Sequence, residues 1–477
     1  MKKSISVFCG LFLLVTTSLF ADGSLTLEEA LKSAIAKNEL INASVKTKEF
    51  SEYELKAAKG KYFPNIFLDG SVNKINSPIV LGLNSARSAI IETSVATLKA
   101  AGTRSAEEIA FFKAQLESKL PNFDMKFQDS LFYKFSAGVT WPLFTGGKIS
   151  ANTKAKEIQV SMSQLEYEKT LNSTITSVIE SYFRAKLAQE ARNIRKDYLN
   201  DIIQHNDNAQ KLFNVGMISK ANKLRAEVAL AQATREYQKS ERDLQLALVV
   251  LSDIIGLDAK NSNLVTDFKK IENMNNSQYY ENIAISNNIS LKNLEHKKEL
   301  ISQKKKSIKG NFLPTVAAFG KYEIYKHNLT LFEPEWVAGL SARLDLFKGG
   351  EDYNEFKAYN TQLEVIDLYI KNANKMIVTA IKKYHHEAKA ALEQYESLKS
   401  SQKLTEENLN LYKKSFTEGL ATSIEVVDAE LALEKVRLEQ SQALFEFNVA
   451  YAHLIDVCAN SQILMNKIIG ETKKNEK

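Results

Sequence analysis

Two stretches of 66 residues, 148–213 and 351–416, contain neither glycine nor proline. Proline destabilises a helix interior by about 3 kcal/mol and glycine by about 1 kcal/mol, so their absence over this length predicts two uninterrupted helices. At about 1.5 Å per residue each helix would extend roughly 100 Å, whereas an average globular helix has about 11–12 residues. A chain of this kind is built around long helices and not around a compact pocket.

Each long run ends at a glycine, Gly216 or Gly419, and a second run without glycine or proline follows. Glycine readily adopts the left-handed conformation that commonly ends a helix. The second runs, 217–255 and 420–458, carry apolar or small residues in steps of four and three, which is the 3.5-residue period of a left-handed coiled coil. We therefore predict two antiparallel helical hairpins. Their tips lie near 214–222 and 417–425.

The two hairpins belong to two halves of the chain that match each other at an offset of 203 residues. The motif LFTGG at 143–147 recurs as LFKGG at 346–350, and FNVG at 213–216 recurs as FTEG at 416–419. Duplication at this spacing indicates one architecture assembled from two similar repeats. The expected organisation is a first repeat over 22–260, a second repeat over 261–460 and a polar tail over 461–477.

The N-terminal residues 1–21 resemble a secretory signal peptide, with Lys2 and Lys3 before an apolar segment and Ala21 at the expected cleavage site. Its removal leaves Cys458 as the one cysteine of the mature chain, so no intramolecular disulfide can form. No later segment has the roughly 18–20 apolar residues of a membrane-spanning helix. The 63 basic and 57 acidic residues nearly balance, which gives no support for nucleic-acid binding.

All six prolines fall within two windows of the sequence, where apolar and polar residues alternate with the period of a β-strand. The expected strands are 63–74, 131–143, 312–326 and 336–346. Trp141, Trp336 and Tyr322 belong to the apolar set. They fit an aromatic girdle on the lipid-facing side of a transmembrane sheet whose polar face lines a lumen. A water-soluble, half-buried sheet has the same alternation, so the pattern alone leaves both interpretations open.

The strand edges favour the membrane interpretation only for an oligomer. Four strands cannot close a barrel, and open strand edges are excluded from lipid. Three chains would supply twelve strands and twelve hairpin helices. The expected fold class is therefore mainly α with membrane β, in which four strands of each chain contribute to a trimeric twelve-stranded barrel that continues into a long α-helical barrel.

Together these features resemble the TolC-type outer-membrane efflux proteins over nearly the whole mature sequence. The resemblance rests on LTLEEA at 25–30, YFP at 62–64, FLP at 312–314, WPLFTGG at 141–147 and LDLFKGG at 344–350, in this order and spacing. It implies a homotrimer in the outer membrane of a Gram-negative bacterium, with a large periplasmic portion. As partners it implies a periplasmic adaptor protein, an inner-membrane transporter and outer-membrane lipid.

The resemblance also places a gate at the periplasmic end, where family members carry acidic residues just after the second hairpin tip. Glu425 and Asp428 match those positions and share a helical face, and a ring of such carboxylates attracts cations. Thr422 and Glu425 also have the form of a capping box, so cap and gate both stay open for Glu425. Asn222 stands where relatives are often acidic and Ala421 where they can be basic. We therefore expect closure without the ion pair of some relatives, with hydrogen bonds from Asn222.

Docking of the adaptor is expected at the same hairpin tips. The candidate residues are Gly216, Met217, Ser219, Gly419, Leu420 and Thr422. Glycine permits close approach of another backbone, but the need to end a helix explains each glycine equally well.

The segment between the first two strands, about 75–130, is much longer than the link near 328–333 between the last two. It contains a helix-like run at 88–120 and is expected to project outside the cell. We favour a solvated insertion over a surface cap, a plug or a receptor loop.

Enzymatic chemistry finds little support in this sequence. Residues 385–387, His-His-Glu, are the nearest approach to a metal cluster, but they lack the spacing of two histidines one helical turn apart. No glycine-rich phosphate loop and no nucleophile with its base is recognisable. We expect neither an enzyme nor a metal or cofactor site.

The function expected is a passive outer-membrane exit duct of a tripartite efflux pump or a type I secretion system. The alternative is a periplasmic coiled-coil or adaptor protein without a pore, which the duplicated amphipathic strands disfavour. A general diffusion porin is disfavoured because most of the chain is helical. The sequence leaves the cargo open among drugs, metals and proteins.

Overall fold

The computed structural model describes residues 23–271, 274–327 and 334–459. The expected signal peptide, the polar tail and the turn near 328–333 therefore lie outside the described residues. The chain forms two compact units. The helical unit comprises the described parts of Met1–Tyr53, Glu157–Ile301 and Thr361–Lys477, and the strand unit those of Glu54–Lys156 and Ser302–Asn360. Each unit takes segments from both halves of the chain.

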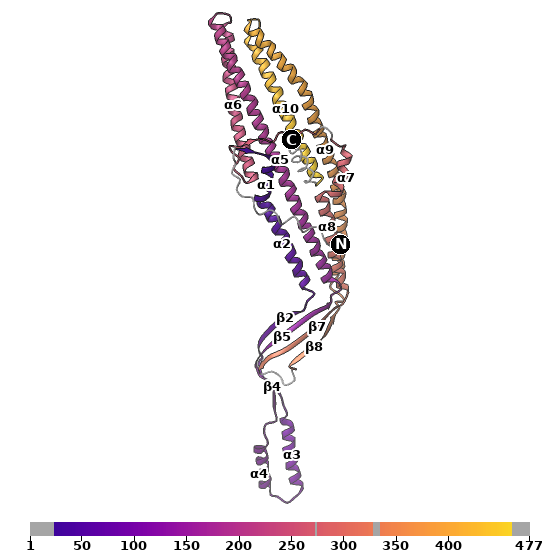
Figure 1. Cartoon of the computed structure of the whole chain (residues 1–477). Coiled ribbons are helices and arrows are strands. Elements are labelled where there is room, and N and C mark those ends of the chain that lie inside the picture. The colour runs from indigo at the N-terminus through magenta and orange to yellow at the C-terminus, as the bar shows by residue number, and fades with distance from the viewer. Residues whose placement is uncertain (1–22, 272–273, 328–333, 460–477) are drawn as a thin grey trace, which may run out of the picture. The chain divides into compact units, whose positions relative to one another are not determined.

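Four long helices form two hairpins, as the runs without glycine or proline predict (Figure 1). In the first hairpin α5 spans Lys148–Asn214 and α6 spans Lys220–Ile255. In the second, α9 spans Glu351–Thr417 and α10 spans Ser423–Val457. α5 and α9 have 67 residues each, which confirms the prediction of uninterrupted helices. No helix in the described ranges combines the length and the apolar composition needed to cross a membrane.

Shorter elements pack against the hairpins of the helical unit. They are α1 (Leu27–Lys37), α2 (Glu39–Gly60), α7 (Ser277–Asn287), α8 (Ile289–Lys309) and a parallel pair of β1 (Ser24–Leu25) and β6 (Asn263–Leu264). The core surrounds Tyr182 and Phe183 of α5, both fully buried. The Tyr182 hydroxyl donates to the Leu25 carbonyl at 2.8 Å and so connects the long helix to β1. The opening motif of the chain has a local role as well, because Thr26 and Glu29 form the capping box of α1.

The strand unit is built on a four-stranded antiparallel sheet in the order β2-β5-β7-β8 (Figure 1). The strands span Asn65–Lys74, Leu131–Phe144, Thr315–His327 and Trp336–Arg343, and the 3₁₀ helix η1 (Gly310–Phe312) precedes β7. All four expected strands are therefore confirmed, although β8 ends three residues earlier than expected. The two outer strands, β2 and β8, are sheet edges, and every residue of β8 is exposed.

The register separates one apolar face of this sheet from one polar face. Leu68, Ala137, Tyr322 and Trp336 lie side by side across the four strands, and Asp69, Ser136 and Glu323 form the adjacent row on the opposite face. Among the described residues nothing covers Leu68 and Trp336 on the apolar face, which are 66% and 67% exposed. The expected alternation of apolar and polar residues is confirmed. A sheet packed in a water-soluble core would bury these apolar residues, so their exposure indicates a surface that contacts lipid or another protein.

The insertion between β2 and β5 differs from its expected form. The helix-like run at 88–120 is divided into α3 (Asn84–Ala100) and α4 (Ala106–Lys119), because Gly102 takes a left-handed φ of 64° and Ser105 caps α4. The insertion also contains a short antiparallel ribbon, not expected from the sequence, of β3 (Ile79–Leu81) and β4 (Met125–Gln128). Strands of three and four residues carry too short an alternation to be recognised.

Candidate gate and docking region at the hairpin tips

Both hairpin tips end in the same backbone motif. At the first tip the N–H of Gly216 donates to the Phe213 carbonyl at 3.0 Å, and that of Met217 donates to Leu212 at 2.9 Å. At the second, Gly419 donates to Phe416 at 3.0 Å and Leu420 donates to Ser415 at 2.8 Å. This is the Schellman motif, and the glycines have φ of 77° and 74°. The duplicated glycines are therefore explained by the helix ends they form.

The six residues expected to dock the adaptor are all exposed at these tips. They include two large apolar side chains, since Met217 is 54% exposed and Leu420 is 78% exposed. The tips also lie next to each other, because the Met217 methyl group is 3.8 Å from the position that a Cβ on Gly419 would take. Ser219 caps α6 and Thr422 caps α10, so these two also serve their own helices.

The expected gate residues Asn222 and Glu425 lie in the first turns of α6 and α10, and Asp428 lies in the second turn of α10. The Glu425 carboxylate accepts hydrogen bonds from the Thr422 N–H at 2.7 Å and from its hydroxyl at 2.8 Å. These bonds hold the pKa of Glu425 below its usual value. Glu425 therefore forms the cap in this chain, and a part in a gate stays a prediction. Asp428 is exposed one turn further along α10.

Asn222 contributes to the tip through its backbone. Its N–H donates to the Ser219 hydroxyl at 3.3 Å and to the Ser219 carbonyl at 3.1 Å, as the third residue of α6 does in a capped helix. The structure brings Asn222 to the tip, while the expectation that its side chain closes the gate stays untested.

A set of polar side chains that the sequence did not reveal joins the two hairpins behind their tips. His205 of α5 is 5% exposed, and its Nε2 lies 2.7 Å from the hydroxyl of Ser423, the first residue of α10. Its ring also lies 4.7 Å from that of Phe416. Burial, reinforced by nearby Lys413, lowers the pKa of His205 to about 4. The imidazole is therefore neutral at physiological pH.

Two buried carboxylates of α10 continue this contact away from the tips. Glu430 is 2% exposed, and the Lys413 ammonium lies 2.5 Å from Glu430 and 3.5 Å from Asp201 of α5. Glu434 lies 3.6 Å from the guanidinium of Arg195 of α5. Burial raises the pKa of both glutamates although Lys413 and Arg195 oppose it. We call these residues the inter-hairpin ladder. They are Arg195, Asp201, His205, Lys413, Ser423, Glu430 and Glu434.

A sequence signal for this ladder does exist. Tyr198, Ile202 and Ala209 are buried on α5 at helical spacing, and His205 falls on the same stripe. A polar residue within an apolar stripe indicates a specific buried partner. The sequence did not reveal that partner because Ser423 lies 218 residues further along the chain.

The expected girdle residues lie on the apolar face of the sheet. Tyr322 and Trp336 are direct cross-strand neighbours, and Trp141 on β5 is 47% exposed and donates from its indole to the Tyr62 carbonyl at 3.0 Å. Sequence analysis missed a second aromatic group. The Tyr133 and His327 rings are stacked at 4.8 Å, eight residues from Trp141 on β5.

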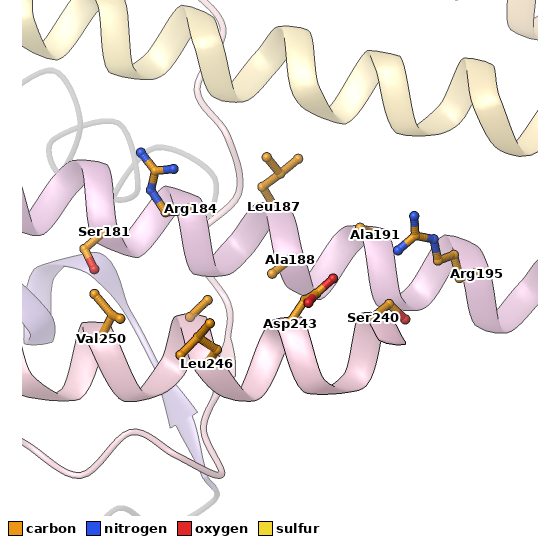
Figure 2. Close-up of a pocket in the computed structure, with 11 residues that line it drawn as sticks. Ser181, Arg184, Leu187, Ala188, Ala191, Arg195, Ser240, Asp243, Leu246 and Val250 are labelled. Atoms are coloured by element: carbon orange, nitrogen blue, oxygen red, sulfur yellow. The ribbon is translucent and has the colours of Figure 1, made fainter. Parts of the chain in front are cut away.

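The described residues offer no grouping of three or more histidine, cysteine or acidic side chains that could hold a metal ion. His385 instead lies 2.9 Å from the Asn275 carbonyl. A groove of about 410 Å³ runs between α5 and α6, and Figure 2 shows its residues. Leu246 and Val250 face small α5 residues there, while Asp243 and Arg195 lie toward one end. Nothing in this arrangement supplies a nucleophile with an adjacent base.

Comparison with known proteins agrees with this architecture. A family model described as outer membrane efflux protein matches residues 30–257 and 282–458, which is most of the chain. The alkaline protease secretion protein AprF of Pseudomonas aeruginosa is 20% identical over 357 residues, covering 71% of this chain and 73% of that protein.

Solved structures show the same fold at low sequence identity. The CmeC outer membrane channel of Campylobacter jejuni has a TM-score of 0.68 at 14% identity, covering 93% of this chain and 89% of that chain. The outer membrane protein VceC of Vibrio cholerae has a TM-score of 0.69 at 12% identity, covering 91% and 96%. The family consists of channel proteins and not of enzymes. The chain thus belongs to the outer membrane efflux protein family and is located in the outer membrane, with a large periplasmic helical part.

Proposed function

We propose that this protein is the exit duct of a tripartite efflux pump or a type I secretion system. It would be a passive channel, opened by a periplasmic adaptor and energised by an inner-membrane transporter. The observation that carries the proposal is a sheet with an uncovered apolar face in the same chain as two 67-residue helices. Lipid solvates such a face, and helices of about 100 Å provide a path through the periplasm. The alternative, a coiled-coil adaptor without a pore, does not explain an exposed apolar face on the sheet.

The assembly we propose is a homotrimer. The four-stranded sheet of one chain leaves β2 and β8 as unpaired edges, which lipid does not tolerate. Three copies would join these edges into a closed barrel of twelve strands. Trp141 and Tyr133 are then about 26 Å apart along β5, at about 3.3 Å per residue, and about 20 Å apart in height for a strand tilted by about 40°. This is about four fifths of the height of the apolar band that aromatic girdles flank, about 25 Å.

The inter-hairpin ladder supports a closed resting state at the periplasmic end. It holds the start of α10 against α5 through buried contacts, and it uses neither Asn222 nor Ala421. An adaptor that binds Met217 and Leu420 would approach within a few residues of Ser423. Opening is proposed as separation of α9 and α10 from α5, which breaks the ladder. Asp428, exposed beside it, would then contribute to a cation-selective ring.

A cross-link across the ladder tests this gate. Cysteines at His205 and Ser423, joined by a short bifunctional reagent that forms a disulfide with each thiol, should prevent export, and a reductant should reverse the effect. A reagent with a spacer is needed because the native contact is made by the far end of the His205 ring, so the two Cβ atoms lie further apart than a direct disulfide spans. The matched controls are the two single variants under the same reagent. Export that continues through the fully cross-linked channel would contradict a gate at this position.

Small molecules and secreted proteins are two of the three cargo classes that the sequence leaves open. AprF is named for the secretion of an alkaline protease, whereas CmeC is described as an outer membrane channel. Deletion of the gene distinguishes these classes of cargo. Increased accumulation of a fluorescent efflux dye would identify small-molecule efflux, and loss of a protein from the culture medium would identify secretion. Unchanged dye accumulation, an unchanged set of secreted proteins and an unchanged metal content of the cells would together argue against an exit duct.

A further inference from the structure

The two halves of one chain meet at a seam that ends in a contact between two glycines. β5 of the first half pairs with β7 of the second, and beneath the pair Gly146 touches Gly310. A Cβ on Gly310 would lie 2.6 Å from the Gly146 carbonyl oxygen, and a Cβ on Gly146 would overlap the carbonyl of Gly310. Only glycine fits at either position, so the seam is a close-packed backbone contact.

Each side of this seam has a second copy in the sequence. LFTGG before α5 recurs as LFKGG before α9, and KGNFLP at 309–314 has its counterpart in KGKYFP at 59–64. The glycines that correspond to Gly146 and Gly310 are Gly349 and Gly60, and apart from the adjoining backbone a Cβ at either would have no atom of the described residues within 4 Å. Leu346 and Phe347 are likewise 89% and 85% exposed.

Their first-half counterparts are far better covered, since Leu143 is 49% exposed and Phe144 is 46% exposed. β5 continues to Phe144 because β7 pairs with it, whereas β8 ends at Arg343. The second half therefore presents the same surface as the first half, without the partner that the first half has. The partner that fits this surface is another copy of this chain, which would contribute its KGKYFP segment and β2.

We propose that the seam between two chains copies the seam within one chain, residue for residue. The proposal rests on the trimeric assembly proposed above and adds its register. Transfer of the β5·β7 register through the two repeats places β8 of one chain antiparallel to β2 of the second copy. Three of the resulting pairs are Arg343 with Asp69, Ser341 with Ser71, and Leu340 with Val72 of the second copy.

The transferred register satisfies tests that were not used to obtain it. Leu340 and Val72 both belong to the apolar face, and the other two pairs belong to the polar face. Arg343 brings a cation opposite the carboxylate of Asp69, where the in-chain seam has Thr140 opposite Phe319. A slip of one residue would pair apolar with polar side chains. A slip of two residues would place Arg343 opposite Phe67 or Ser71 and lose the charge pair.

Cysteine cross-linking at Ser71 and Ser341 tests the register. Directly opposite residues in an antiparallel pair have Cα atoms about 4.5–5.5 Å apart, which a disulfide spans. The S71C/S341C variant should give covalent dimers and trimers on non-reducing gels, and a reductant should abolish them. Cys458 is 2% exposed and does not interfere. The matched control is N73C/S341C, which would cross-link only in a register slipped by two residues.

The outcomes separate this proposal from the proposed assembly. Cross-linking of S71C/S341C alone supports the register. Cross-linking of the control alone, or of neither variant while native trimers persist, overturns the register and leaves the trimer standing. Absence of any native oligomer overturns the assembly itself. As a second readout, R343D should lower the temperature at which the trimer dissociates, and the exchanged pair D69R/R343D should restore it. A D69R/R343D variant no more stable than R343D would count against the pairing.

Discussion

His205 is the residue whose chemistry the fold changes most. In water a histidine has a pKa of about 6.5, but burial between α5, α9 and α10 lowers that of His205 to about 4. The charged groups that face it are Lys413 on α9, with Asp201 on α5 and Glu430 on α10 around that ammonium. Its neutral ring can bond to the Ser423 hydroxyl without a buried charge.

The closed tip should therefore weaken in acid. A histidine whose pKa falls on folding stabilises the packed state above its ordinary pKa, and this contribution is lost between about pH 6.5 and pH 4. Glu430 has the opposite effect on the pH dependence of stability, because burial raises its pKa and its protonation favours the packed state at low pH. We predict that single-channel conductance rises between pH 7.5 and pH 5.5. The His205→Gln variant should lose this rise, because it retains a hydrogen-bonding group that does not titrate. An equal rise in both proteins would refute the role of His205.

Removing the charge of Asp428 should change ion selectivity more than removing the charge of Glu425. Asp428→Asn is expected to reduce cation selectivity, measured as the reversal potential of single channels in a salt gradient. Glu425→Gln removes the charge from a carboxylate already bound to Thr422, so we expect a smaller change in selectivity and a loss of order at the start of α10. Thr422→Ala serves as the control for the cap. If Glu425→Gln alters the reversal potential as strongly as Asp428→Asn, Glu425 also belongs to the gate.

At the scale of elements, local rules account for the ends of the helices, and long-range contacts account for what the helices touch. The Schellman turns at both tips follow from glycine. The insertion shows the same locality. Arg87 donates to carbonyls of Glu117 and Leu120, and Asn84 donates to Asp124, so these contacts stay within the insertion.

Removal of the helical part of the insertion should leave the rest of the protein unchanged. Ile91 is the single residue of α3 and α4 that is buried, with 4% of its surface exposed. We predict that replacement of 85–118 by a short glycine–serine linker preserves the heat stability of the trimer and the export rate. The measurements are heat-modifiable mobility on gels and dye efflux. Lower efflux with an intact trimer would instead indicate a cap or plug.

At the scale of the whole molecule, the duplicated junction predicts opposite results for two corresponding glycines. Gly310→Ala should lower the free energy of unfolding of each chain by about 1–3 kcal/mol, because the added methyl group meets the Gly146 backbone. Gly60→Ala meets no atom of its own chain and replaces glycine at the end of α2, where alanine is favoured by up to about 1 kcal/mol. We expect it to leave the folded chain intact and to weaken the trimer. Circular dichroism of the chain and heat-modifiable mobility of the trimer measure the two effects.

The sequence by itself determined the long helices, their glycine tips, the four amphipathic strands and the family. Each of these depends on residues close together in the chain, or on a repeat that can be read directly. The tertiary structure decided which surfaces meet. It placed Ser423 against His205 and Gly310 against Gly146, and it joined β5 to β7. Contacts between residues more than a hundred positions apart depend on how helices and strands pack, and no local pattern of hydrophobicity or conformational preference records them.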